Sequence, residues 1–133
     1  MAREAWAAYE RYGWPADSVR GWSKGPANVH FGPHSGHSIV AALSTLWVMG
    51  LTEQFDRARA WVAGRGESLG GGGGGGGLSF GSQDELVNVH RTMVQFVGGL
   101  LSAYSLSEDE IFLQRAVEVV DSLEPAWRTP TGQ

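Results

Sequence analysis

Residues 87–104 read VNVHRTMVQFVGGLLSAY, and this stretch decides the fold class. Its apolar residues recur at intervals of three and four, as they do on the buried face of an amphipathic helix. Ser82 and Glu85 form a capping box before the run, and a polar break begins at Ser105. The sequence therefore predicts a helix whose buried stripe consists of Val89, Met93, Phe96, Val97, Leu100 and Tyr104.

Four further segments carry helical spacing, and each has its own start or stop signal. Pro15 ends the first, Gly50 fits the end of the second, and Pro125 stops the last. Residues 16–36 are rich in Gly, Pro, Ser, Asn and His, which predicts a long loop. Because no segment alternates with period two over the length of a strand, the predicted fold class is all-α, built from helical hairpins. These helices are expected at about residues 3–12, 35–49, 52–64 and 107–123, the last with a capping box at Ser107 and Glu110.

The composition of the 133 residues excludes several classes of function. A net charge of −4, with one Lys and nine Arg, leaves no basic stripe for nucleic acid. The absence of cysteine excludes disulfides, thiolate metal sites and cysteine nucleophiles. No apolar run reaches the roughly 18 residues of a membrane span, and the N-terminal residues do not resemble a signal peptide or a membrane anchor. The compartment therefore stays open.

Residues 70–77 are an unbroken run of glycine. A run of this kind behaves as a flexible coil, so we expect a flexible linker at residues 66–79 inside a single domain spanning residues 1–133. A phosphate-binding loop would need spaced glycines between a strand and a helix, with a Lys-Ser/Thr pair or a downstream acid. The run has none of these features.

Two groups of side chains outside the helices could bind a ligand. His30, His34 and His37 could suggest a metal site, but Gly32-Pro33 would interrupt a helix that aligned them, and no carboxylate is adjacent. No metal-binding residues are therefore predicted. Trp14 and Trp22 could stack on sugar rings, although burial against helix ends is the interpretation that we favour.

Three segments resemble one enzyme family, in that family's order. Trp6 through Trp14, followed by residues 17–25, is similar to the family's opening helix and Glu-Leu-Arg-Pro loop. Residues 38–51 resemble a helix that reads Ile-Val-Asp-Ala-Leu-Asp-Thr-Leu and ends Ile-Met-Gly-Leu. Residues 87–104 align without gaps to a helix with Val-Asn-Val-Phe-Glu-Thr-Thr-Ile-Arg followed by Gly-Gly-Leu-Leu-Ser-Ala-Tyr. The chain thereby resembles the N-terminal portion of the class I α-1,2-mannosidases, glycoside hydrolase family 47.

This resemblance implies a fold, a substrate and a cofactor. The fold would be an incomplete arc of an (α/α)7 barrel, so that residues 1–133 form a partial domain. The substrate would be a mannose-rich N-glycan, hydrolysed with inversion in the lumen of the endoplasmic reticulum or Golgi. A calcium ion would lie at the barrel bottom, with its ligands and the catalytic base expected in a segment beyond Gln133.

The polar positions of the family's site are substituted in this sequence. Arg91 stands at the general-acid position and Gln95 at an Arg position, while Ala41 and Ser44 replace two Asp residues. No Asp or Glu lies between Gly25 and Thr52 or between Leu86 and Ser107. The fourteen carboxylates are instead expected at the solvated and capping positions where acids normally occur.

Inverting hydrolysis needs two carboxyl groups. No catalytic residue is therefore predicted, and Arg91, Gln95 and Ser44 are candidates for substrate binding. The sequence predicts a truncated chain similar to a mannosyl-oligosaccharide 1,2-α-mannosidase that does not hydrolyse glycans by itself. Two alternatives stay open: a non-catalytic helical module that binds a glycan or a protein, and a non-functional gene fragment. An arc of helices would also leave open apolar faces, through which the chain could self-associate.

Overall fold

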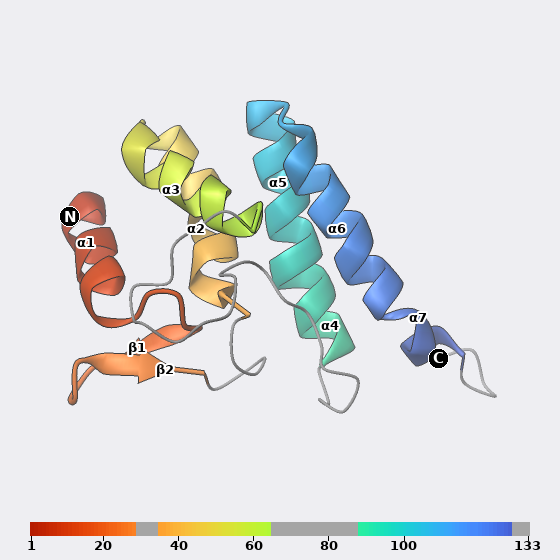
Figure 1. Ribbon diagram of the computed structural model, residues 1–133, viewed down its shortest axis with the longest axis horizontal. Coiled ribbons are helices and arrows are strands. Elements are labelled where there is room, and N and C mark those ends of the chain that lie inside the picture. Colours follow the sequence, from red (N-terminus) through yellow and green to blue (C-terminus); the bar gives the residue numbers. More distant parts are fainter. Residues whose placement is uncertain (29–34, 65–87, 129–133) are drawn as a thin grey trace.

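A computed structural model describes residues 1–28, 35–64 and 88–128 of the chain (Figure 1). The described part is mostly helical, with one two-stranded sheet. The helices are α1 (Ala2–Tyr12), α2 (His37–Val48), α3 (Thr52–Val62), α4 (Val89–Thr92), the π-helix η1 (Met93–Val97), α5 (Gly98–Ser107), α6 (Glu110–Ser122) and α7 (Glu124–Trp127). The strands are β1 (Ser18–Arg20) and β2 (Gly25–Ala27).

The five predicted helices are confirmed, with small changes at their ends. α4, η1 and α5 follow one another without a break and together form the helix predicted from residues 87–104. Asn88 caps its start, because its side-chain oxygen accepts a hydrogen bond from the Arg91 amide at 2.9 Å. The capping box predicted at Ser82 and Glu85 lies outside the described residues. Asp109, and not Ser107, caps α6.

The prediction of an all-α fold is wrong in one place. β1 and β2 pair antiparallel inside the segment predicted as a loop, with Ser18 opposite Ala27 and Arg20 opposite Gly25. Each strand has only three residues, too few to show a period of two, so the sequence pattern carried no strand signal. The rest of that segment, residues 29–34, lies outside the described residues.

Two helical hairpins, α2–α3 and α5–α6, pack side by side and hold the core (Figure 1). α2 lies against α5, where Gly99 allows the two backbones to approach at Val40. The ring of His37 lies 6.0 Å from that of Phe96. His37 comes three residues before Val40, and Phe96 comes three residues before Gly99, so the two helices run parallel. The largest fully buried side chains come from both hairpins: Trp61, Phe96, Phe112, Ile39, Leu43 and Leu100. Each side chain of this size contributes roughly 1.5–3 kcal/mol when buried.

An aromatic cluster joins α1 to this core. Trp6, Tyr9 and Trp14 are each at most 8% exposed, and the ring of Trp14 lies 6.3 Å from that of Trp61 on α3. An ion pair of 2.8 Å between Glu10 and Arg57 also links α1 to α3. The preferred interpretation of Trp14 as a buried residue is therefore confirmed.

Two predictions about the organisation of the chain are not decided by these elements. The linker predicted at residues 66–79 falls outside the described residues. The grouping of residues 1–133 into a single domain also stays a prediction. Within the described ranges, no helix has both the length and the hydropathy needed to span a membrane.

Candidate functional site

The candidate site is built on the start of the helix formed by α4 and η1. Arg91 is exposed in α4, and Gln95 is half-buried in η1, one turn further along the same helix. The Oε1 atom of Gln95 is buried and has no hydrogen-bond partner among the described residues. A buried acceptor without a donor costs about 1–3 kcal/mol, so a hydrogen-bond donor that reached Gln95 would offset this cost.

Gln95 lies in an unusual backbone conformation. The five residues Met93–Val97 form a π-helix, in which the hydrogen-bonded ring contains one residue more than in an α-helix. Such turns occur as single interruptions of α-helices and are frequent at functional sites. No sequence pattern predicts this π-helix, because the apolar spacing through the turn fits a regular helix as well.

The structure does not bring Ser44 to the same place as Arg91 and Gln95. Ser44 is half-buried on α2, four residues after Val40, whereas Arg91 lies eight residues before Gly99, the residue that faces Val40. Since the two helices run parallel, these twelve residues place Ser44 about 18 Å from Arg91 along the helix axes. Of the three predicted substrate-binding residues, Arg91 and Gln95 can therefore contact one ligand group together, while Ser44 belongs to another level of the helices.

Asp17 is the polar residue that the sequence reasoning missed. We expected all carboxylates at solvated or capping positions, but Asp17 is fully buried. Its carboxylate accepts a hydrogen bond from the Ser35 hydroxyl, and its carbonyl oxygen accepts one from the Ser38 hydroxyl at 2.5 Å. Its backbone amide donates to the side-chain oxygen of Asn28 at 3.2 Å. These partners lie 11 to 21 residues away in the sequence, so no local motif could identify the group.

The environment of Asp17 explains why a carboxylate is stable there. Its Oδ1 atom lies 3.5 Å from the backbone nitrogen of His37 at the start of α2, where the helix dipole favours negative charge. α2 has Gly36 at its N-cap and thus no capping side chain of its own. On the other side, Tyr9 donates a hydrogen bond of 2.6 Å to the Ala16 carbonyl. Burial, and secondarily the charge of Asp17, raises the pKa of the Tyr9 hydroxyl.

Asp17 therefore holds elements of the fold together. Through Ser35, Ser38 and Asn28 it joins the end of α1, the β hairpin and the N-terminus of α2. This group fixes the direction in which α2 leaves the hairpin, and α2 in turn supports the helix that carries Arg91 and Gln95.

No cluster of His, Asp and Glu side chains that could hold a metal ion is found among the described residues. His30 and His34 lie outside the described ranges, and His37 sits at the start of α2 beside Phe96. Within residues 1–28, 35–64 and 88–128, no three side chains of His, Asp or Glu gather as a metal site. None of these side chains is therefore assigned to calcium.

Trp22 differs from the interpretation that we favoured for it. Its side chain is 104% exposed at the turn between β1 and β2, so it is not buried against a helix end. It lies on a different element from Arg91 and Gln95.

Comparison with known proteins identifies the family of the chain. The model of glycosyl hydrolase family 47 matches residues 1–133. The chain is 41% identical over 128 residues to mannosyl-oligosaccharide 1,2-alpha-mannosidase MNS1 of Arabidopsis thaliana, covering 96% of this chain and 20% of that protein. It is 38% identical over 129 residues to the endoplasmic reticulum mannosyl-oligosaccharide 1,2-alpha-mannosidase of Schizosaccharomyces pombe, covering 97% and 22%. For mannosyl-oligosaccharide 1,2-alpha-mannosidase IA of Sus scrofa the identity is 38% over 133 residues, covering 99% and 18%.

The chain thus spans about a fifth of the length of the curated relatives that it matches. The match nevertheless includes every helix described above, together with the β hairpin and the buried Asp17. The chain therefore belongs to glycosyl hydrolase family 47.

Proposed function

We propose that this chain binds mannose-rich N-glycans through Arg91 and Gln95 and does not hydrolyse them by itself. One observation carries the proposal: two neighbouring helices of this chain contain no carboxylate, although the chain belongs to a glycosidase family. Residues 26–51 and 87–107 have neither Asp nor Glu, and they include all of α2, α4, η1 and α5. Family membership implies that the two hairpins formed with α3 and α6 correspond to part of an (α/α)7 barrel.

The chemistry of an inverting glycosidase supports the second half of the proposal. One carboxyl group must protonate the leaving oxygen, and a second must activate water on the opposite face of the sugar. The resemblance gives the first role to the position of Arg91. A guanidinium group stays charged at any working pH, so it cannot deliver a proton as a carboxylic acid does.

The polar chemistry of the same helix supports the first half. Arg91 presents a planar set of N–H donors that suits the oxygen atoms of sugar hydroxyl groups. Gln95 adds an acceptor that is buried and lacks a donor among the described residues. A sugar hydroxyl group could donate to Gln95 and accept from Arg91 at the same time.

Two assays on the 133-residue chain test this function. Calorimetric titration with a mannose-rich N-glycan should show binding that weakens about fivefold to tenfold in Arg91→Ala and in Gln95→Ala, the loss expected for one hydrogen bond. Arg3→Ala is the matched control, because Arg3 is exposed on α1, a different element from the helix that carries Arg91 and Gln95. The same oligosaccharide should release no free mannose.

Either half of the proposal can fail independently. Mannose release that stops when calcium is chelated would show that the chain is an active hydrolase. Equal affinity of the two site variants and wild type would remove Arg91 and Gln95 from the binding site. Arg91→Glu should not create turnover, because it restores one carboxyl group and the reaction needs two.

A further inference from the structure

The turn between β1 and β2 carries an aromatic side chain with no cover. Residues 21–24 connect the strands, and the amide of Lys24 donates to the Arg20 carbonyl at 2.9 Å, which closes the turn. Trp22 at its tip is 104% exposed. Figure 1 shows the turn projecting away from the helices at the lower left. A Cβ atom added to Gly21 would meet nothing within 4 Å, so there is open space beside this residue of the turn.

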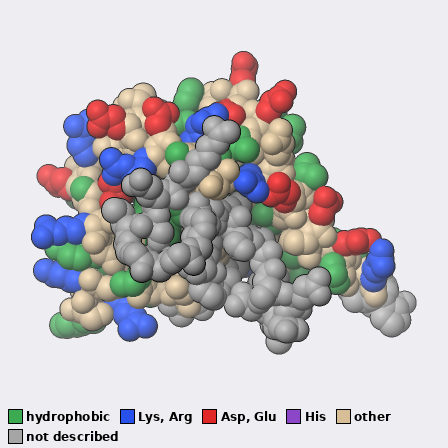
Figure 2. Space-filling view, in the orientation of Figure 1, with side chains coloured by type: hydrophobic (Ala, Val, Ile, Leu, Met, Phe, Trp, Pro, Cys, Tyr) green, Lys and Arg blue, Asp and Glu red, His purple; other side chains and the backbone are tan. Residues whose placement is uncertain are grey.

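The turn and the neighbouring helix carry three cations. Arg20 and Lys24 come two residues before and two residues after Trp22 in the sequence, and Arg11 lies in the last turn of α1. The Lys24 ammonium group and the Arg11 guanidinium group lie 5.8 Å and 5.2 Å from the centre of the Tyr12 ring, which joins the turn to α1. On the face shown in Figure 2, side chains of Lys and Arg gather with hydrophobic ones over this region.

Few opposite charges neutralise these cations. Asp17 is the one acid among residues 11–28, and it is fully buried among its own partners. The chain as a whole carries a net charge of −4, so this group of three cations differs in sign from the net charge of the chain. We call Trp22 with Arg11, Arg20 and Lys24 the hairpin tip.

The backbone at the hairpin tip is strained. Lys24 has a φ of 49°, in the left-handed region that glycine adopts without cost. A Gly in its place would relieve the strain but would remove a charge from the tip. Strain of this kind persists where the surrounding structure or a function requires the residue.

We propose that the hairpin tip binds the surface of an anionic phospholipid bilayer. Trp22 would enter the headgroup layer, where indole rings are favoured because they are both apolar and able to donate a hydrogen bond. Arg11, Arg20 and Lys24 would pair with anionic headgroups, which attract clustered Lys and Arg. The projecting turn favours this partner, because a fluid headgroup layer can close around an exposed ring. The proposal does not depend on glycan binding by Arg91 and Gln95.

Co-sedimentation of the full chain with vesicles tests the hairpin tip. The chain should bind vesicles of equal parts phosphatidylcholine and phosphatidylserine. Binding to vesicles of phosphatidylcholine alone should be at least about fivefold weaker, and salt of about 1 M should abolish it, since the Debye length then falls to about 3 Å. Lys24→Gly should weaken binding about fivefold while relieving the backbone strain, so that loss of folding does not explain the result. Trp22→Ser should weaken it as well.

Controls at the other end of the molecule make the test specific. Trp127→Ser and Arg128→Gln remove an exposed indole and an exposed cation from the region of α7 and should leave vesicle binding unchanged. No binding to the mixed vesicles, equal binding to both kinds of vesicle, or indifference to Trp22→Ser and Lys24→Gly would each overturn the proposal. Equally strong binding to soluble polyglutamate would also overturn it and would reassign the hairpin tip to an acidic protein.

Discussion

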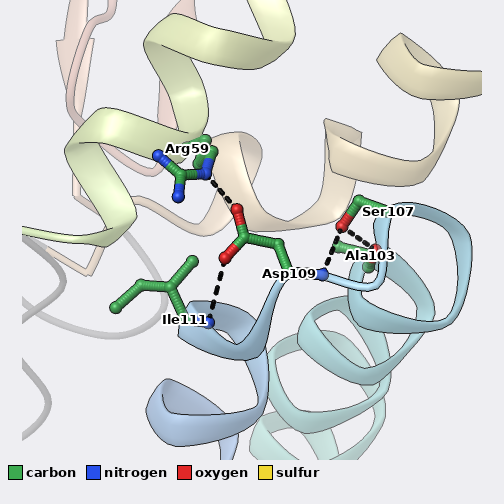
Figure 3. Close-up of polar contacts among 5 residues, drawn as sticks. All are labelled: Arg59, Ala103, Ser107, Asp109 and Ile111. Carbon is green, nitrogen blue, oxygen red and sulfur yellow. Dashed lines mark hydrogen bonds and ion pairs between the residues drawn. The ribbon is translucent and has the colours of Figure 1, made fainter.

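Asp109 links two helical hairpins with one carboxylate. One oxygen accepts a hydrogen bond of 3.2 Å from the Ile111 amide and so caps α6, while the other pairs with the Nε atom of Arg59 on α3 (Figure 3). The Ser107 hydroxyl donates to the Ala103 carbonyl at 2.7 Å and faces the Asp109 amide, which fixes the turn between α5 and α6. The cap and the ion pair therefore orient α6 relative to α3.

Separate substitutions distinguish the two roles of Asp109. Asp109→Ala removes the cap and the ion pair and should lower the free energy of unfolding by about 1–2 kcal/mol. Asp109→Asn retains a capping oxygen and should cost no more than about 1 kcal/mol. Urea unfolding followed by circular dichroism measures both. Glu124→Ala, which breaks an exposed pair with Arg128, is the control and should cost less than about 0.5 kcal/mol. Equal costs for the Ala and Asn variants would contradict a capping role.

The same carboxylate predicts a pH dependence. The hydrogen bond from Arg59 lowers the pKa of Asp109, and the Ile111 amide contributes in the same direction. A lowered pKa in the folded state stabilises the protein above the unfolded-state value, about 3.9, and this contribution disappears as pH falls through the folded value. The difference in unfolding free energy between wild type and Asp109→Asn should therefore stay constant at neutral pH and shrink below about pH 4. A difference that shrinks near pH 6.5, where histidine titrates, would refute this assignment.

Gly36 cannot accept a side chain. It has a φ of 59° at the start of α2, and an added Cβ would overlap three carbon atoms of the Trp61 ring. Gly36→Ala should lower the free energy of unfolding by about 3 kcal/mol, from backbone strain and from steric overlap. Gly50→Ala is a matched control, because Gly50 has a φ of 67° with open space around it. That variant should lose only about 1 kcal/mol, and similar losses in both would show that Trp61 moves aside.

The two adjacent glycines of α5 should respond in opposite directions. A Cβ at Gly99 would lie 3.0 Å from a Val40 methyl carbon and 3.1 Å from the Val40 carbonyl oxygen. Because that oxygen belongs to the backbone of α2, Gly99→Ala should push the helices apart and cost about 1–3 kcal/mol. Gly98 is exposed, and Gly98→Ala should gain up to about 1 kcal/mol from helix propensity. Thermal unfolding of both variants measures this difference. A gain in stability for Gly99→Ala as well would show that Gly99 faces solvent and not α2.

Apolar side chains continue on the side of α5 and α6 that faces away from α2 and α3. On α6 each of these exposed residues comes one position after a buried residue: Leu113 after Phe112, Val117 after Ala116 and Val120 after Val119. Arg115, one position before Ala116, donates to the Ala63 carbonyl after α3. Leu101 is two residues from Gly99 and so points nearly opposite to α2. We call this surface the open flank: Leu101, Leu113, Val117 and Val120 are 42%, 37%, 52% and 37% exposed.

The open flank should drive self-association of the chain. Gel filtration with light scattering should detect assemblies larger than a monomer, because an exposed apolar patch of this kind favours association. The double substitution Leu101→Gln and Val117→Gln should shift them toward the monomer. Val48→Gln, at a residue that is 74% exposed at the end of α2, is the control and should have no effect. A monomer at every concentration tested would contradict the prediction.

Local sequence signals predicted the helices well, but they did not predict contacts between residues that are further apart in the sequence. The spacing of Phe96, Val97 and Leu100 fixes a buried stripe within one segment, and all three are buried. The β hairpin depends on pairing between Ser18 and Ala27, and the Asp17 group depends on hydroxyl groups about twenty residues away. Neither relation has a periodic pattern in the sequence, since each joins residues that come together only when the chain folds back on itself.

The candidate site was predictable to a different degree. Residue type and order placed Arg91 and Gln95 on one helix, and the structure puts them one turn apart. Whether Ser44 lies beside them depends on how α2 is placed along the axis of α5. The close approach of Val40 and Gly99 sets that placement. A sequence pattern specifies which side of a helix is buried but does not specify how far one helix is displaced along another.

The wide turn at Met93–Val97 has a consequence for insertions and deletions in this helix. One extra residue per turn corresponds to about 100° of rotation, which the π conformation absorbs without unwinding the helix. Deleting a single residue there would convert the turn to a regular one and leave the anchored portion after Gly98 in place. Arg91 would keep its present direction, because the π conformation already compensates for the extra residue. The wide turn therefore lets this helix differ in length by one residue while it presents the same side chain at position 91.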